Sequence, residues 1–319
     1  EKAAHIFTKT GKTKKKQPNF FMVAAKEFIG KKRYKDASIV FTGLLKGAPD
    51  NSTLHYLAGI SFDSLKESKK AIKHFLKVKP DSRHYKKIVI HIAFLYSDLD
   101  KIEKAIGFLE NKHEELPEDI DIITYLASFY EESSEHAKAM ATLEKGLVLS
   151  PDNSSLSFRL GIVQDKAGKK KECIETMKKI IALEPDNASA LNYLGYTYAD
   201  LGINLDTAEE LINRALKIKP SDGFITDSLG WVFFKRGQYE KAIEILVKAA
   251  EITSFDPIIS EHLADAYEKN NNLNKALKLY KQALSNSKDK NLELEKKIME
   301  LEKKIDKQPA DKEEIDEKN

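Results

Sequence analysis

The stretch LNYLGYTYADLGINLDTAEELINRALKIKP, residues Leu191–Pro220, contains the pattern that decides the fold. Its second half places the small residue Ala208 four positions before the bulky Ile212 and twelve positions before Pro220. The same order of small residue, bulky residue and proline returns elsewhere along the chain. The stretch is therefore one copy of an internal repeat and not an isolated glycine-rich ligand loop.

The small residue of this pattern recurs at a nearly constant interval of 34 residues. One interval, from Cys173 to Ala208, is 35 residues long, and we expect the turn GINLD at residues 202–206 to bulge and hold the extra residue. A register kept over so many copies indicates structural repeats. The eight small residues are Ala37, Ala71, Ala105, Ala139, Cys173, Ala208, Ala242 and Ala276.

Each copy carries a second landmark, a Leu-Gly or Leu-Ala pair upstream of the small residue, as in Leu194-Gly195 and Leu229-Gly230. Both halves of a copy show apolar residues at i, i+3 and i+4, the spacing of an amphipathic helix. We expect the small residues to lie where the two helices of a hairpin approach most closely. Proline followed by Asp or Asn should end one copy and cap the next helix.

These motifs resemble the tetratricopeptide repeat (TPR) family over about Pro18–Ser287. The segments NYLGYTYADLG at 192–202 and DSLGWVFFKRGQYEKAIEILVKAAE at 227–251 fit the family pattern closely. The first three copies fit it more loosely. In the second copy, Pro80 follows Ala71 after only nine residues, so the second helix should be shorter by about a turn.

The resemblance implies an all-α fold, a right-handed α-solenoid of about eight TPR helical hairpins with a concave groove. It also implies a binding module and not an enzyme. The last four copies resemble in particular TPR proteins of bacterial cell envelopes. One hairpin cannot bury its apolar face alone, so neighbouring copies must stack.

The sequence predicts four segments: a basic leader at 1–17, the solenoid at 18–288, a capping helix at 289–305 and a charged tail at 306–319. The capping helix follows from Leu294, Ile298, Leu301 and Ile305, which are spaced by four and three residues. That spacing would cover the last hairpin, although it would also suit a short coiled-coil seam.

One stripe of each first helix should line the groove, because it points away from the packing face at 100° per residue. In the third copy this stripe is Ile90, Phe94 and Ser97, and it is most aromatic in copies five to seven and acidic in copy eight. The predicted partner-binding residues are Phe158, Asn192, Tyr196, Asp227, Trp231, Phe234, Glu261, Asp265 and Glu268.

Two of these assignments have alternatives that the sequence leaves open. Trp231, the only tryptophan, would mark a partner site if it is exposed, because large apolar groups on an exposed concave surface do so. It would instead fill space between adjacent copies if it is buried. The acidic stripe of Glu261, Asp265 and Glu268 would hold a basic partner segment, or would be a solvated face.

The composition argues against several other functions. The 53 basic and 50 acidic residues leave a net charge of +3, so general nucleic-acid binding is not expected. The single cysteine, Cys173, permits no intramolecular disulfide and no cysteine-based zinc site. No phosphate-binding, nucleophile-elbow or metalloprotease motif is present. We therefore expect no cofactor, no metal and no catalytic residue.

The sequence accordingly predicts an interaction scaffold that holds a peptide or helix of another protein in the groove. The alternative is a structural protein that assembles head-to-tail, because one end of the chain is basic and the other acidic. The chain starts at Glu1, and together with the envelope resemblance this leads us to expect export in a bacterium. Membrane contact would then be indirect, through a removed anchor or the basic leader.

Overall fold

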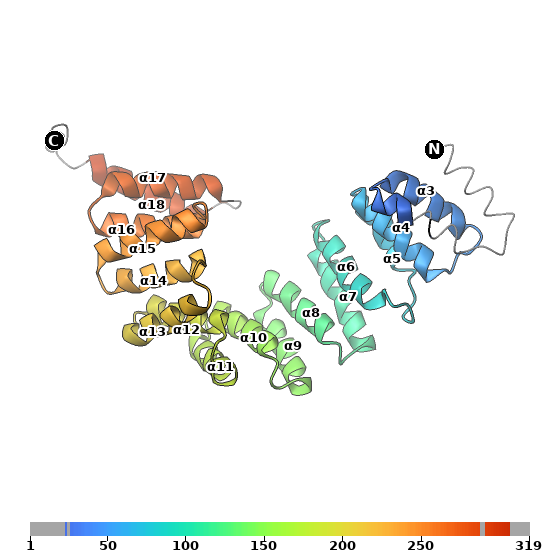
Figure 1. The fold of residues 1–319 in the computed structure, drawn as a ribbon, viewed down its shortest axis with the longest axis horizontal. Helices are drawn as coiled ribbons and strands as arrows, with labels where there is room; N and C mark the ends of the chain where they lie inside the picture. The colour runs from blue at the N-terminus through green and yellow to red at the C-terminus, as the bar shows by residue number, and fades with distance from the viewer. Residues whose placement is uncertain (1–22, 24–25, 288–290, 307–319) are drawn as a thin grey trace. The chain divides into compact units, whose positions relative to one another are not determined.

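The computed structural model describes residues 23, 26–287 and 291–306 of the 319-residue chain. Every regular element among these residues is a helix (Figure 1). The chain divides into two compact units, Glu1–Pro151 and Asp152–Asn319, with four of the small residues in each. No helix that the structure describes is both long enough and apolar enough to cross a membrane.

The first unit consists of helical hairpins joined by short turns. Residues 26–30 are helical and precede the first complete helix. The helices are α3 (Tyr34–Leu45), α4 (Ser52–Ser64), α5 (Ser68–Phe75), α6 (Tyr85–Ser97), α7 (Ile102–Glu115), α8 (Ile120–Glu132) and α9 (His136–Leu149).

The second unit continues the pattern, and its hairpins follow one another in chain order up to α18 beside α17 (Figure 1). The helices are α10 (Ser154–Lys166), α11 (Lys170–Leu183), α12 (Ala188–Leu201), α13 (Leu205–Ile218), α14 (Gly223–Lys235), α15 (Tyr239–Ile252), α16 (Pro257–Lys269), α17 (Leu273–Asn286) and α18 (Leu292–Asp306). The predicted all-α solenoid of helical hairpins with a C-terminal capping helix is confirmed.

The repeated small residues mark the closest helix contacts, as predicted, and all eight are 0% exposed. The glycine of the first helix meets the bulky residue that follows the small residue by four positions. A Cβ built on Gly195 would come within 2.6 Å of Ile212, and one on Gly230 within 2.6 Å of Leu246. The pattern in the sequence is therefore a packing pattern.

The turn signals also act as expected. The Asn and Asp residues that follow the prolines cap the first helices, because their side chains accept hydrogen bonds from free backbone N–H groups in the first turn. Asn187, for example, accepts from the backbone N–H of Ala190 at 3.0 Å. The side-chain caps of this kind are Asn51, Asp119, Asn153, Asn187 and Asp222, whereas Asp256 caps α16 in the same way but directly precedes Pro257.

The 35-residue interval has a different basis from the predicted bulge. The extra residue extends α12, which has 14 residues where α10, α14 and α16 have 13. The turn after α12 remains short, and both Gly202 and Asn204 adopt left-handed backbone conformations, with φ of 68° and 48°. Glycine accommodates such a conformation at no steric cost, and Asn tolerates it.

The shortened second helix of the second copy is present as predicted. Helix α5 has 8 residues, whereas α7, α9 and α11 have 14 each. At the other end of the chain, Leu294, Ile298 and Leu301 of α18 are buried against α17. The basic leader at 1–17 and most of the charged tail lie outside the described residues.

Candidate functional site

The predicted groove residues of the second unit lie on the first helices of its four hairpins. Helix α12 contacts α14, and α14 contacts α16, so their stripes are neighbours. The residues are Phe158 on α10, Asn192 and Tyr196 on α12, Asp227, Trp231 and Phe234 on α14, and Glu261, Asp265 and Glu268 on α16.

Trp231 is buried, which decides between the two interpretations that the sequence left open. Its ring is 8% exposed and stacks on Phe234 with centroids 4.4 Å apart and planes at 8°. It also stacks on His262 of α16 at 4.3 Å and 21°. The reason is the next copy of the repeat, since α16 packs against α14 and brings His262 onto the indole. Trp231 therefore fills space between copies, which was the alternative interpretation.

A buried ion pair holds this aromatic contact in place. The Nδ1 atom of His262 lies 2.9 and 3.0 Å from the two carboxylate oxygens of Asp227. Asp227 is 6% exposed, so this stripe residue is also buried. Burial lowers the pKa of His262, but the hydrogen bond and charge of Asp227 outweigh it, and the net pKa is raised. The carboxylate therefore makes protonation of this imidazole easier than it would be in water.

His262 is the functional-site candidate that the sequence reasoning missed. It immediately follows Glu261 in the stripe of the eighth copy, but periodicity alone assigns it to neither the core nor the groove. The signal in the sequence was the position of His262, which lies next to the stripe residue Glu261. The first helix of the preceding copy carries Asp227, which can pair with it.

The remaining aromatic and amide residues of the stripe keep accessible surface. Phe158, Asn192, Tyr196 and Phe234 are all half-buried. Burial, followed by the charges of Asp200 and other aspartates, raises the pKa of Tyr196 to about 12, so its hydroxyl stays protonated. These four side chains flank the buried Trp231 and are the parts of the stripe that a second molecule can contact.

Two buried polar atoms in the stripe have no hydrogen-bond partner among the described residues. They are the indole N–H donor of Trp231 and the Oδ1 acceptor of Asn192. Buried polar groups in proteins are usually paired, so such exceptions need an explanation. The donor lies on α14 and the acceptor on the adjacent helix α12. The backbone of a bound peptide offers the complementary C=O and N–H groups, and side chains would have to shift to let them in.

The acidic stripe of α16 meets a basic segment within the same chain. Lys297 of α18 lies 2.8 Å from Glu261 and 3.0 Å from Asp265, and Lys304 lies 3.3 Å from Glu268. The stripe is therefore neither free nor simply solvated, because the capping helix already supplies its cations. Self-association stays a prediction.

The exposed aromatic of a first-helix stripe lies in the first unit. Phe94 of α6 is 43% exposed, and its ring makes an edge contact with Tyr125 at 5.4 Å and a tilted contact with Phe129 at 5.5 Å. The periodicity places it on the stripe of the third copy. The sequence instead predicted the partner-binding residues in copies five to eight, because the stripe contains the most aromatic residues in copies five to seven.

The described residues form no metal-binding cluster at this site. Across residues 23, 26–287 and 291–306, no three His, Cys, Asp or Glu side chains are placed to hold a metal ion. Cys173 is 0% exposed, and burial raises the pKa of its thiol to about 12. Such a thiol is protonated and unreactive at neutral pH.

Helical hairpins stacked through a small-residue contact define a class of repeat protein with extended binding surfaces. Residues 158–289 match the sequence model of the tetratricopeptide repeat family. This part of the chain therefore carries tetratricopeptide repeats, as its resemblance to the family predicted. This family mediates protein–protein interaction and is typically non-catalytic.

A curated relative, a TPR repeat-containing protein of Pseudomonas aeruginosa, is 42% identical over 62 residues. The match covers 19% of this chain and spans only 10% of the length of that relative. Its description names no cellular location, so export and the envelope resemblance stay predictions.

Solved structures support the fold over a larger part of the chain. A tetratricopeptide repeat protein from Parabacteroides merdae has a TM-score of 0.66 and 15% identity, covering 78% of this chain and 98% of its own. A TPR protein from Thermus thermophilus gives 0.52 and 21%, covering 57% and 98%. The Cut9–Hcn1 hetero-tetramer gives 0.59 and 17%, covering 89% of this chain and 56% of the matched chain. At these identities the likeness shows the fold alone.

Proposed function

We propose that the second unit is a protein-binding scaffold that holds a peptide or helix of a partner along the first helices α10, α12 and α14. Its contact residues are Phe158, Asn192, Tyr196 and Phe234, which keep accessible surface. Trp231 lies behind them as a fixed support and not as the contact itself. The proposal thus keeps the predicted surface but changes the role of its tryptophan.

The observation that carries this proposal is a surface whose side chains are already held in place. Trp231 stacks on both Phe234 and His262, and Asp227 fixes His262. A partner then loses less free energy to the ordering of side chains, and this preorganisation raises affinity. Half-buried aromatic side chains on a rigid surface are also the residues that dominate protein interfaces.

The acidic residues Glu261, Asp265 and Glu268 have a secondary role in this proposal. Because Lys297 and Lys304 already pair with them, an incoming basic segment would have to displace α18. We therefore assign the partner to the α10–α14 part of the stripe.

The test is affinity capture from native lysate with the wild type and Tyr196→Ala, followed by mass spectrometry. Tyr196→Ala is expected to lose captured partners, because it removes an accessible ring from the middle of the surface. Leu183→Ala is the control, since Leu183 is 56% exposed but lies on the second helix α11, outside the stripe of the first helices. If both variants capture the same proteins as the wild type, the surface assignment fails.

A further inference from the structure

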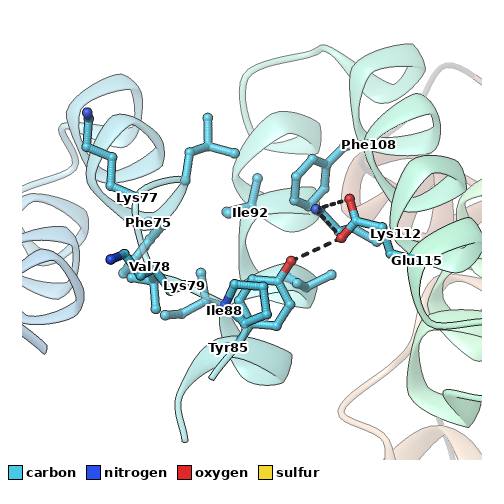
Figure 2. Close-up of a pocket in the computed structure, with 13 residues that line it drawn as sticks. Phe75, Lys77, Val78, Lys79, Tyr85, Ile88, Ile92, Phe108, Lys112 and Glu115 are labelled. Carbon is cyan, nitrogen blue, oxygen red and sulfur yellow. Dashed lines mark hydrogen bonds and ion pairs between the residues drawn. The ribbon is translucent and has the colours of Figure 1, made fainter. Parts of the chain in front are cut away.

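A cavity of about 340 Å³ lies in the first unit, beside the C-terminal end of α5. Its walls come from α5 and the loop that follows, from α6 and from α7. Figure 2 shows Phe75 and Val78 on the α5 side, Phe108 on the opposite side, and Ile88 and Ile92 between them. It lies within the size range of about 300–1,000 Å³ typical of ligand pockets.

The cavity follows from the early end of α5. This helix has 8 residues where α7 has 14, so it lacks about 9 Å of the length that the repeat normally provides. The missing turns would have packed against α6 and α7. Pro80 prevents the helix from continuing, since it has no backbone N–H and its ring clashes with the preceding turn. The apolar surface that those turns would cover is left as a hollow.

The floor of this hollow is apolar and buried. Phe75, Val78, Ile88 and Ile92 are all buried, between 1% and 4% exposed. Leu76, by contrast, is 52% exposed at the edge of the cavity. A large apolar side chain placed here would bury both surfaces, at a gain of roughly 25 cal/mol per Å².

The rim of the hollow is positively charged. Lys77 and Lys79 are exposed and form no ion pair with any residue in the described part of the chain. Figure 2 shows both on the α5 side, with their ammonium groups directed away from the apolar floor. On the other side, Lys112 is already paired, since it donates to both oxygens of Glu115 at 2.7 Å.

The surrounding sequence extends this positive charge. Residues 66–87 contain nine Lys or Arg against one Glu and one Asp. The pKa of His84, next to the lining residue Tyr85, is lowered by burial and by the charges of Arg83 and Lys87. The charges of these two residues add to the effect of burial, so the lysines and arginines of this segment carry the argument for a positive rim.

We propose that this hollow is a second docking site, for an acidic segment of a partner protein that carries a large apolar side chain. The apolar side chain would enter where the missing turns of α5 would lie. The flanking carboxylates would meet Lys77 and Lys79, which have no acidic partner among the residues that the structure describes. The site is separate from the α10–α14 surface and does not rest on the function proposed for that surface.

The probe is a fluorescein-labelled helical peptide rich in glutamate, with two leucines four residues apart, titrated with the full chain by fluorescence anisotropy. The wild type should bind it saturably. The double variant K77E/K79E should weaken binding by about tenfold or more, because two attractions become repulsions. Leu76→Ala should also weaken binding, and it should not disturb the fold because Leu76 is exposed.

The matched control is K69E/K73E, which makes the same charge change at exposed lysines of α5 outside the lining. It should keep most of the binding, as should Tyr196→Ala in the second unit. Absence of binding by the wild type overturns the proposal, as does equal weakening by both double variants. A fourth outcome also overturns it: phosphatidylglycerol vesicles bind through Lys77 and Lys79 while the peptide does not.

Discussion

The two units carry a histidine at the same position of the repeat, but in different surroundings. His91 of α6 precedes Ala105 by 14 residues, and His262 of α16 precedes Ala276 by 14. His91 lies 3.0 Å from Asp63, with both side chains partly exposed at 40% and 29%. His262 lies 2.9 Å from Asp227, with side chains exposed by only 13% and 8%.

The comparison shows that the burial of a His–Asp pair, and not the identity of its residues, decides how much the pair contributes to stability. An exposed pair is screened by water and contributes little, typically below about 1 kcal/mol. A buried pair cannot lose one partner without leaving a charge or a polar group unsatisfied. Trp231 sets the depth in the second unit, because its ring covers His262.

The largest expected effect is therefore the loss of that ring. Trp231→Ala should destabilise the second unit by about 3–5 kcal/mol, the usual cost of removing a buried large aromatic side chain. Urea unfolding followed by far-UV circular dichroism measures it, since the variant contains no tryptophan. A loss below about 1 kcal/mol would show that the indole is exposed in solution.

The second expected effect separates the two His–Asp pairs. Asp227→Ala should cost about 2 kcal/mol, because it leaves the buried imidazole of His262 without its acceptor. Asp63→Ala should cost less than about 1 kcal/mol, because His91 and Asp63 are partly exposed. Urea midpoints of the two variants give the comparison. Equal losses of unfolding free energy in the two variants would show that burial does not decide the contribution of the pair.

A third expected effect concerns the glycine contacts of the hairpins. Gly230→Ala should cost about 1–2 kcal/mol, because its Cβ would lie 2.6 Å from the fully buried Leu246. In Gly59→Ala, the added Cβ would lie 2.3 Å from the ring of Phe75, but that ring can shift toward the cavity. The loss of stability should therefore be smaller than in Gly230→Ala.

Gly107→Ala is the control for this pair, since nothing lies within 4 Å of the added Cβ. Alanine favours a helix interior over glycine, so this variant should gain up to about 1 kcal/mol. Thermal unfolding of the three variants shows the order. A larger loss for Gly59→Ala than for Gly230→Ala would mean that the cavity gives Phe75 no room.

The smallest expected effect is on pH dependence, and it has opposite signs in the two units. The folded pKa of His262 is raised above 6.5, so its stabilisation is fully present below pH 6.5 and is lost as the pH rises through the folded value. Burial, and then the charge of His55, lowers the pKa of His74 to about 4, so its stabilisation is lost as the pH falls from 6.5 toward 4.

Hydrogen exchange between pH 4 and 8 follows the two units separately. After correction for the intrinsic exchange rate, protection of α14 and α16 should fall toward the alkaline end, and protection of α4 and α5 should fall toward the acidic end. His262→Gln should flatten the first trend and His74→Gln the second. An unchanged profile in either variant would assign the trend to other groups.

The sequence was sufficient to predict the hairpins and their register, because both depend on local spacing. Ala208, Ile212 and Gly195 identify the closest contact without any knowledge of the neighbouring copy. The shortened α5 was also predictable, since Pro80 acts on its own segment. The cavity that results was not, because it depends on which side chains of α6 and α7 face the missing turns.

The sequence was sufficient to predict which helices carry the residues of the candidate site, but not which of these side chains are exposed. A stripe at 100° per residue correctly places Tyr196 and Trp231 on their helices, yet the burial of Trp231 depends on His262, 31 residues further along the chain. The pairing of the acidic stripe likewise required α18, whose Lys297 reaches back to Glu261. Contacts between copies are tertiary, and periodicity within one copy contains no information about them.

The buried thiol of Cys173 has a practical consequence. It is the chain's one cysteine, and it lies at the closest contact of the hairpin α10–α11. A maleimide can reach it only when that hairpin opens, so the labelling rate measures the frequency of local opening at this place. The labelling rate of Cys173 therefore reports the local opening of the hairpin α10–α11. A partner that binds this hairpin and holds it closed should lower that rate.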